Sequence, residues 1–107
     1  MKSIRIGMVG KGFIADLHCR AYQKIYGYEV ILAGLYSKHE AGTKQFADKY
    51  GFKKIYKSME EMLADPTLDI IDVCTPPFLH IPMARQVLSA GKHVILEKPL
   101  TGYFGDE

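Results

Sequence analysis

Hydrophobic residues along this chain alternate between short runs rich in β-branched residues and longer stretches with helical spacing. The short runs predict strands at residues 3–10 (SIRIGMVG), 28–37 (YEVILAGLYS), 68–76 (LDIIDVCTP) and 92–97 (KHVILE), with a further short strand at 54–56. Such alternation is typical of a parallel sheet covered by crossover helices. Because residues 28–37 are almost continuously apolar, we expect a central strand that is buried on both faces.

The stretches between these runs predict helices. Residues 13–26 carry apolar side chains three and four positions apart, at Ile14, Leu17, Ala21 and Ile25, and Gly27 is a suitable stop. Residues 39–51 predict a second helix, with Phe46, Ala47 and Tyr50 on one side and Gly51 behind them.

Two further helices have recognisable ends. In SMEEML, Ser58 and Glu61 form a capping box, in which each side chain bonds the backbone amide of the other, and this helix should end near Asp65 and Pro66. Residues 78–91 (FLHIPMARQVLSAG) predict a helix with Pro82 in its first turn and Gly91 at its end. The pattern as a whole predicts an α/β fold.

Composition narrows the class of protein. The chain of 107 residues has room for one domain, and its 48% hydrophobic and 24% charged residues are ordinary for a globular protein. A net charge of +2 without a basic block gives no nucleic-acid footprint. Neither a signal peptide nor a membrane span is recognisable. Cys19 and Cys74 show no metal-ligand spacing, so we expect no metal, two reduced buried thiols and a cytoplasmic location.

A glycine-rich turn follows the first predicted strand. Gly10-Lys11-Gly12-Phe13-Ile14-Ala15 is the pattern G-x-G-x-x-A between a strand and a helix. Gly10 permits the tight turn, Gly12 lets the backbone approach a pyrophosphate, and Ala15 allows the helix to pack closely on the strand. The anion would bind the free amides at the helix N-terminus. Lys11 either attracts the phosphates or is a solvated surface charge.

The end of the second strand bears on the choice of cofactor. An acidic residue about 20 residues after the glycines would bind the ribose hydroxyls of NAD. Glu29 has that separation but lies at the entering end of its strand, whereas the exit end reads Tyr36-Ser37-Lys38. A hydroxyl and an ammonium group suit the additional phosphate of NADP. The cofactor is therefore NAD or NADP, with a slight preference for NADP.

Two other strand ends carry candidate chemistry. CTPPFLH includes Thr75, Pro76 and His80, and EKP includes Glu97 and Lys98. Alone, His80 is explained as a helix cap or a partly buried histidine, and Lys98 as half of an ion pair with Glu97 or another acid. In an open α/β sheet, however, these strand ends converge on one crevice, where a lysine would supply a positive charge and a hydrogen-bond donor. Lys98 is the residue that we most readily expect to be catalytic.

Together these residues resemble the glucose-fructose oxidoreductase, inositol dehydrogenase and rhizopine-catabolism family (Gfo/Idh/MocA). Four features carry the resemblance: GMVGKGFIA, YKSMEEMLADPTLDIIDVCTP, the histidine of PPFLH, and AGKHVILEKPL. It implies a Rossmann-type, doubly wound parallel sheet with helices on both faces. It also implies an oxidoreductase that acts on the CH–OH group of a sugar, polyol or related metabolite and that forms homo-oligomers, with no nucleic-acid or membrane partner.

The resemblance also assigns residues to the cofactor site: Gly10, Gly12, Phe13 and Ile14 at the pyrophosphate; Ser37 and Lys38 at the adenosine ribose; Thr75, Pro76 and His80 towards the nicotinamide; Glu97 and Lys98 at the nicotinamide ribose and reacting centre. It implies a dinucleotide-binding domain at residues 1–100, and at 101–107 the start of a connection to a missing substrate and oligomerisation domain.

Two features depart from the family pattern. Pro77 stands where an asparagine is common, and TGYFGDE does not continue as the usual helix. We therefore expect the chain alone to bind cofactor without turnover. Two alternatives remain open: a non-catalytic NAD(P)-sensing regulator of the same fold, and an interaction domain without cofactor.

Overall fold

Four parallel strands form a single sheet in the computed structural model, which describes residues 2–75 and 80–96. The strands are β1 (Lys2–Val9), β2 (Tyr28–Tyr36), β3 (Ile70–Val73) and β4 (His93–Leu96). Their spatial order is β2-β1-β3-β4, with every neighbouring pair parallel. The four strands predicted at 3–10, 28–37, 68–76 and 92–97 are thus confirmed, although β1 begins one residue earlier and β3 two residues later than predicted; residues 76 and 97 lie outside the described residues.

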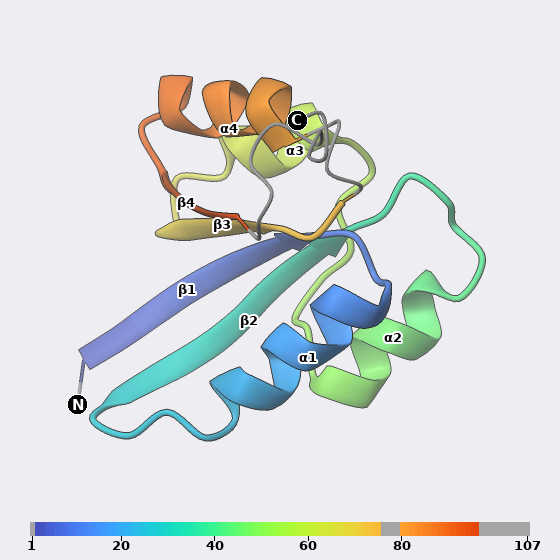
Figure 1. Cartoon of the computed structure of the whole chain (residues 1–107), viewed down its shortest axis with the longest axis vertical. Coiled ribbons are helices and arrows are strands. Elements are labelled where there is room, and N and C mark those ends of the chain that lie inside the picture. Colours follow the sequence, from blue (N-terminus) through green and yellow to red (C-terminus); the bar gives the residue numbers. More distant parts are fainter. Residues whose placement is uncertain (1, 76–79, 97–107) are drawn as a thin grey trace, which may run out of the picture.

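Helices cover both faces of this sheet. They are α1 (Phe13–Tyr22), α2 (Thr43–Tyr50), α3 (Met59–Ala64) and α4 (His80–Ser89). Figure 1 shows α1 and α2 against one face and α3 and α4 against the other. This arrangement confirms the predicted doubly wound α/β fold. Within the described ranges, no helix has the length and apolar character that crossing a membrane requires.

The two faces of the sheet bury two separate hydrophobic cores. One is centred on Ile6, Met8, Ala15, Cys19, Leu32, Leu35 and Ala47, which come from β1, β2, α1 and α2. The other is centred on Val9, Ala33, Tyr56, Met62, Leu68, Ile71, Val73 and Val87. Because successive strand residues point to opposite faces, the chain supplies both cores from the same short strands.

The chain reverses its direction of travel across the sheet between β1 and β3. From β1 it crosses to β2 on one side, and from β2 it returns to β3 on the other side of β1. At this point the Gly10 amide donates to the Tyr36 carbonyl at 2.8 Å, and the Cys74 amide donates to the Val9 carbonyl at 2.8 Å. Ligands of open α/β sheets bind at such a switch point, outside the carboxyl ends of the strands.

The prediction that β2 is a central strand is wrong: among the described strands it lies at an edge of the sheet. Its apolar second half is nevertheless covered, because the following chain folds beside it. Ile55 pairs with Leu35 as an isolated parallel bridge, which is all that forms of the strand expected at 54–56. Tyr56 packs so closely over Gly34 that a Cβ there would lie 2.1 Å from its ring.

The first helix is shorter than predicted and buries a different face. It ends at Tyr22 rather than at residue 26, and Leu17 and Ile25, expected inside, are 43% and 45% exposed. Its buried residues are Ala15 and Cys19. The reason lies in β3, where the fully buried Asp72 carboxylate accepts hydrogen bonds from two polar side chains of α1. Polar pairing therefore overrides apolar periodicity here.

The buried faces and the ends of α2 and α3 agree with the sequence signals, except that α2 begins at Thr43 rather than at residue 39. The predicted Phe46, Ala47 and Tyr50 side of α2 faces inward, and α2 ends at Gly51 in the left-handed conformation. The Ser58 hydroxyl accepts from the Glu61 amide at 3.0 Å, and α3 ends before Asp65. The return bond of the capping box differs: the Glu61 carboxylate accepts from the Lys57 amide, at 2.6 Å, rather than from that of Ser58.

Candidate dinucleotide-binding cleft

A cleft of about 660 Å³ opens outside the carboxyl ends of β1, β2 and β3. Its walls are formed by the turn after β1, the segment after β2 and the end of β3, with Met83 of α4 completing it. The lining residues are Val9, Gly10, Lys11, Gly12, Tyr36, Ser37, Lys38, His39, Cys74, Thr75 and Met83. The volume falls in the range of sites that enclose most of a small organic ligand.

Gly10 and Gly12 meet different physical requirements in this cleft. Gly10 has a φ of +104°, and a Cβ there would lie 2.4 Å from the Cys74 carbonyl oxygen. The turn therefore needs a glycine at this position in order to fold. Gly12 has an ordinary φ of −84°, and a Cβ there would meet nothing within 4 Å. Its missing side chain leaves open space at the mouth of the helix, which is what a close backbone–phosphate approach requires.

The N-terminus of α1 faces this space. Gly12 is its N-cap, and no side chain caps the first turn. The first amides of a helix have no partner within the helix, and they carry the positive end of its dipole. The helix begins immediately after the turn that lines the cleft, so these donors are available to an anion bound there.

Lys11 joins the glycine turn to the segment after β2. Its ammonium group donates to the Ser37 hydroxyl at 2.8 Å and to the His39 carbonyl at 2.6 Å. The same carbonyl accepts from the Ser37 hydroxyl at 3.2 Å and from the Thr43 hydroxyl at 3.0 Å, which ties this segment to the start of α2. In the part of the chain that the structure describes, no carboxylate forms an ion pair with Lys11 or Lys38.

The structure brings most of the predicted residues that it describes into one place. Gly10, Gly12, Ser37, Lys38 and Thr75 all line the cleft. Phe13 and Ile14 follow in the first turn of α1 but do not line it, and the Phe13 side chain is 74% exposed. The backbone of His80 begins α4.

Three of the predicted residues, Pro76, Glu97 and Lys98, lie outside the described residues, as does the His80 side chain. Sequence reasoning overlooked His39, whose contribution is a backbone carbonyl, and it left Lys11 undecided. The spacing of Lys11 from the glycines does not reveal its partner, because Ser37 lies 26 residues away.

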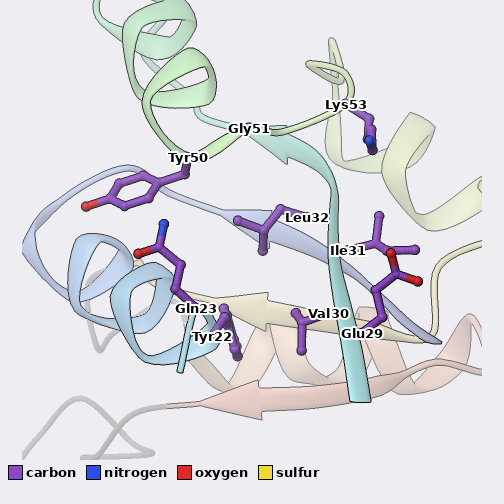
Figure 2. A pocket seen from close by; sticks show the side chains of 9 residues that line it. All are labelled: Tyr22, Gln23, Glu29, Val30, Ile31, Leu32, Tyr50, Gly51 and Lys53. Atoms are coloured by element: carbon purple, nitrogen blue, oxygen red, sulfur yellow. The ribbon is translucent and has the colours of Figure 1, made fainter. Parts of the chain in front are cut away.

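Glu29 lies at the other end of β2, as expected. It borders a smaller hollow of about 220 Å³, together with Tyr22 and Gln23 from the end of α1 (Figure 2). Its carboxylate accepts from the Ser3 hydroxyl at 3.0 Å. Since Glu29 lies at the amino end of the strand, it is not placed to contact a ribose in the cleft at the carboxyl end.

Cys74 connects the cleft to a partly buried polar cluster behind it, which includes His18 and Asp72. It is partly exposed, which corrects the expectation that both thiols are buried, whereas Cys19 is fully buried. Burial raises the pKa of the Cys19 thiol to about 12. The Cys74 thiol lies 3.3 Å from the Asp72 carboxylate and 3.5 Å from Nδ1 of His18.

Comparison with known proteins identifies relatives over nearly the whole chain. An oxidoreductase of Schizosaccharomyces pombe, described as uncharacterized, is 40% identical over 107 residues. Myo-inositol 2-dehydrogenase of Thermotoga maritima is 32% identical over 98 residues, or 92% of this chain. A solved levoglucosan dehydrogenase in complex with NADH and L-sorbose superposes with a TM-score of 0.84, at 26% identity over 94% of this chain.

This chain spans less than a third of each of these proteins: 29% of the two relatives and 28% of the levoglucosan dehydrogenase chain. The sequence profile of the Gfo/Idh/MocA family, described as an oxidoreductase family with an NAD-binding Rossmann fold, matches residues 4–106. The chain therefore belongs to the Gfo/Idh/MocA family of oxidoreductases and has its NAD-binding Rossmann fold.

Proposed function

We propose that the cleft after β1 and β2 binds NADP in preference to NAD, and that the chain is the cofactor-binding part of an oxidoreductase. The observation that carries this proposal is the direct link between the glycine turn and a cationic edge. Lys11 lies between the two glycines and bonds Ser37 across the cleft, and Lys38 follows directly. One continuous surface thus offers donors for a pyrophosphate and for an additional phosphate.

The glycine turn supports the pyrophosphate part of the proposal. Gly12 leaves room for the anion, and the uncapped amides of α1 supply donors without any side chain. The Gly10 amide donates to the Tyr36 carbonyl, which holds the turn and its amides in place before ligand arrives. A preorganised site of this kind loses little conformational entropy on binding.

The positive charge at the carboxyl end of β2 supports the choice of NADP. The 2′-phosphate distinguishes NADP from NAD and adds about two negative charges near neutral pH. Lys11 and Lys38 have no carboxylate partner among the described residues, and the acid that binds the ribose of NAD is missing from the exit end of β2. An anion here would gain attraction without breaking an existing ion pair.

For a protein of the length of these relatives that contains this chain, we propose reversible oxidation of a CH–OH group on a sugar, polyol or related small metabolite. Myo-inositol 2-dehydrogenase and levoglucosan dehydrogenase, to which the chain is similar, support this substrate class. When bound, the nicotinamide ring supplies or accepts the hydride. We assign Lys98 to polarising the substrate oxygen, Glu97 to the nicotinamide ribose, and Thr75, Pro76 and His80 to the wall beside the nicotinamide.

Calorimetric titration of the chain with NADPH and NADH, at matched ionic strength, tests the proposal. We expect tighter binding of NADPH. Lys38→Met and Lys11→Met should each weaken NADPH binding by roughly 10-fold to 100-fold, because a hydrogen bond to a charged group contributes about 1.5–3 kcal/mol. NADH, which lacks the 2′-phosphate, should lose less than about 3-fold with Lys38→Met, a residue outside the glycine turn.

Lys44→Met provides a matched control. Lys44 lies on the nearby helix α2, is exposed, and pairs with Asp48 at 3.0 Å. The Lys44→Met substitution should change the affinity for NADPH far less than Lys38→Met does. Equal affinity for the two cofactors, or equal effects of the Lys44 and Lys38 variants, would contradict the assignment of a 2′-phosphate site to this edge.

A further inference from the structure

A partly buried polar cluster lies directly behind the cofactor cleft, between α1 and β3. It consists of His18 and Tyr22 on α1, Asp72 on β3, and Cys74 just beyond the end of β3. The ligand atoms of His18, Asp72 and Cys74 all lie within 4.8 Å of one another. An imidazole nitrogen, a carboxylate oxygen and a thiol sulfur are the three donor types that bind zinc in proteins.

We propose that His18, Asp72 and Cys74 form a binding site for a divalent transition-metal ion of the zinc type. The proposal does not depend on cofactor binding. The sequence did not suggest it because the residues are not locally spaced: His18 and Cys74 are 56 positions apart, and the fold alone brings them together. The fourth position of a tetrahedral ion would be left for a further donor, such as water.

The two distances from the Cys74 sulfur fit a tetrahedral ion. With bonds of about 2.0 Å to nitrogen and oxygen and 2.3 Å to sulfur, neighbouring ligand atoms stand roughly 3.3–3.5 Å apart. The Cys74 sulfur is 3.5 Å from Nδ1 of His18 and 3.3 Å from Oδ1 of Asp72. Nδ1 of His18 lies 2.7 Å from the other carboxylate oxygen, Oδ2, in a hydrogen bond that an ion bound through Oδ1 would replace.

The charge in the cluster also favours a cation. Asp72 is fully buried, and among the described residues its one ion-pair partner is the His18 ring, which carries charge only when it is protonated. A buried carboxylate is costly unless it is paired or coordinates a metal. A divalent ion would compensate both the Asp72 carboxylate and a Cys74 thiolate.

Tyr22 supplies the support that metal ligands normally have around them. Its hydroxyl donates to the Asp72 carboxylate. Hydrogen bonds of this kind orient ligating groups, and their loss typically weakens metal binding 10-fold to 100-fold. Access is available as well, because Cys74 lines the cleft.

Titration of the full chain, reduced and stripped of metal, with Co²⁺ tests the site directly. Thiolate coordination gives Co²⁺ a charge-transfer absorption in the near ultraviolet, and Zn²⁺ should abolish that absorption by displacement. We expect one equivalent of Co²⁺ per chain, with the band lost in Cys74→Ser and binding weakened roughly 10-fold to 100-fold in Tyr22→Phe. Cys19→Ser is the matched control, because Cys19 lies beside His18 on α1 but contacts the Met8 sulfur instead.

Two results would overturn the proposal. One is a folded wild-type chain that shows no thiolate band at millimolar Co²⁺, which would mean that the cluster is satisfied by its own hydrogen bonds. The other is a band that persists in Cys74→Ser or disappears in Cys19→Ser, which would place the metal elsewhere. Circular dichroism of each variant tests whether it is folded. If a variant is unfolded, the presence or absence of the thiolate band in the wild-type chain still decides the proposal.

Discussion

The two glycines of the turn should respond in opposite ways to a side chain, and this contrast tests the geometry of the cleft. An L-residue at the Gly10 φ of +104° is strained by about 1–3 kcal/mol. The added Cβ would also lie 2.4 Å from the backbone oxygen of Cys74, in a segment held by the bond from its amide to Val9. We expect Gly10→Ala to lower the free energy of unfolding by roughly 3 kcal/mol.

For a domain of this size, each kcal/mol shifts the Tm by about 4–8 °C, so Gly10→Ala should lower the Tm by roughly 12–24 °C. Gly12→Val places its side chain in open space at an ordinary φ, and its Tm should change by less than about 4 °C. Differential scanning calorimetry of the three proteins measures both shifts. A Gly10→Ala variant as stable as wild type, or a Gly12→Val variant as unstable as Gly10→Ala, would refute this reasoning.

Three further predictions concern stability and thiol chemistry. Ser58→Ala removes the N-cap of α3 and should cost about 1 kcal/mol in chemical denaturation; no change would exclude the cap as a stabilising element. Hydrogen bonds, above all from the Thr67 hydroxyl, lower the pKa of Asp65 to about 2, below its usual 3.8. Its contribution to stability is therefore complete above about pH 4 and is lost as the pH falls towards 2, so the difference between wild type and Asp65→Asn should shrink over that range. Iodoacetamide labelling followed by peptide mass spectrometry should modify Cys74 before Cys19, whose pKa is raised by burial, and NADPH should slow the reaction of Cys74.

The sequence predicted the cleft well because its signals are local. A strand, a turn with small residues and a helix follow one another within residues 2–22, so spacing alone places Gly10 and Gly12. Ser37 and Lys38 follow from the rule that parallel strands end at one edge of the sheet. The cap of α3 is equally local.

What could not be predicted depends on contacts between distant segments. The buried face of α1 is set by Asp72, which lies 54 positions from His18 and 50 from Tyr22. The spacing of apolar residues along the chain does not reveal this polar pairing. The place of β2 at the edge depends on the spatial order of the strands in the sheet rather than on the composition of β2. The hydrogen bond from Lys11 to Ser37 could not be predicted either, because it joins residues 26 positions apart.

Titration of wild type and Gly12→Val with NADPH tests the central claim, that the glycine turn holds the pyrophosphate of a dinucleotide. The valine side chain would fill the space left for the anion without disturbing the fold. We predict that the wild-type chain binds NADPH and that Gly12→Val binds at least 100-fold more weakly while unfolding at nearly the same temperature. Equal binding by the two proteins, or no binding of NADPH to the folded wild-type chain at millimolar concentration, would contradict the claim.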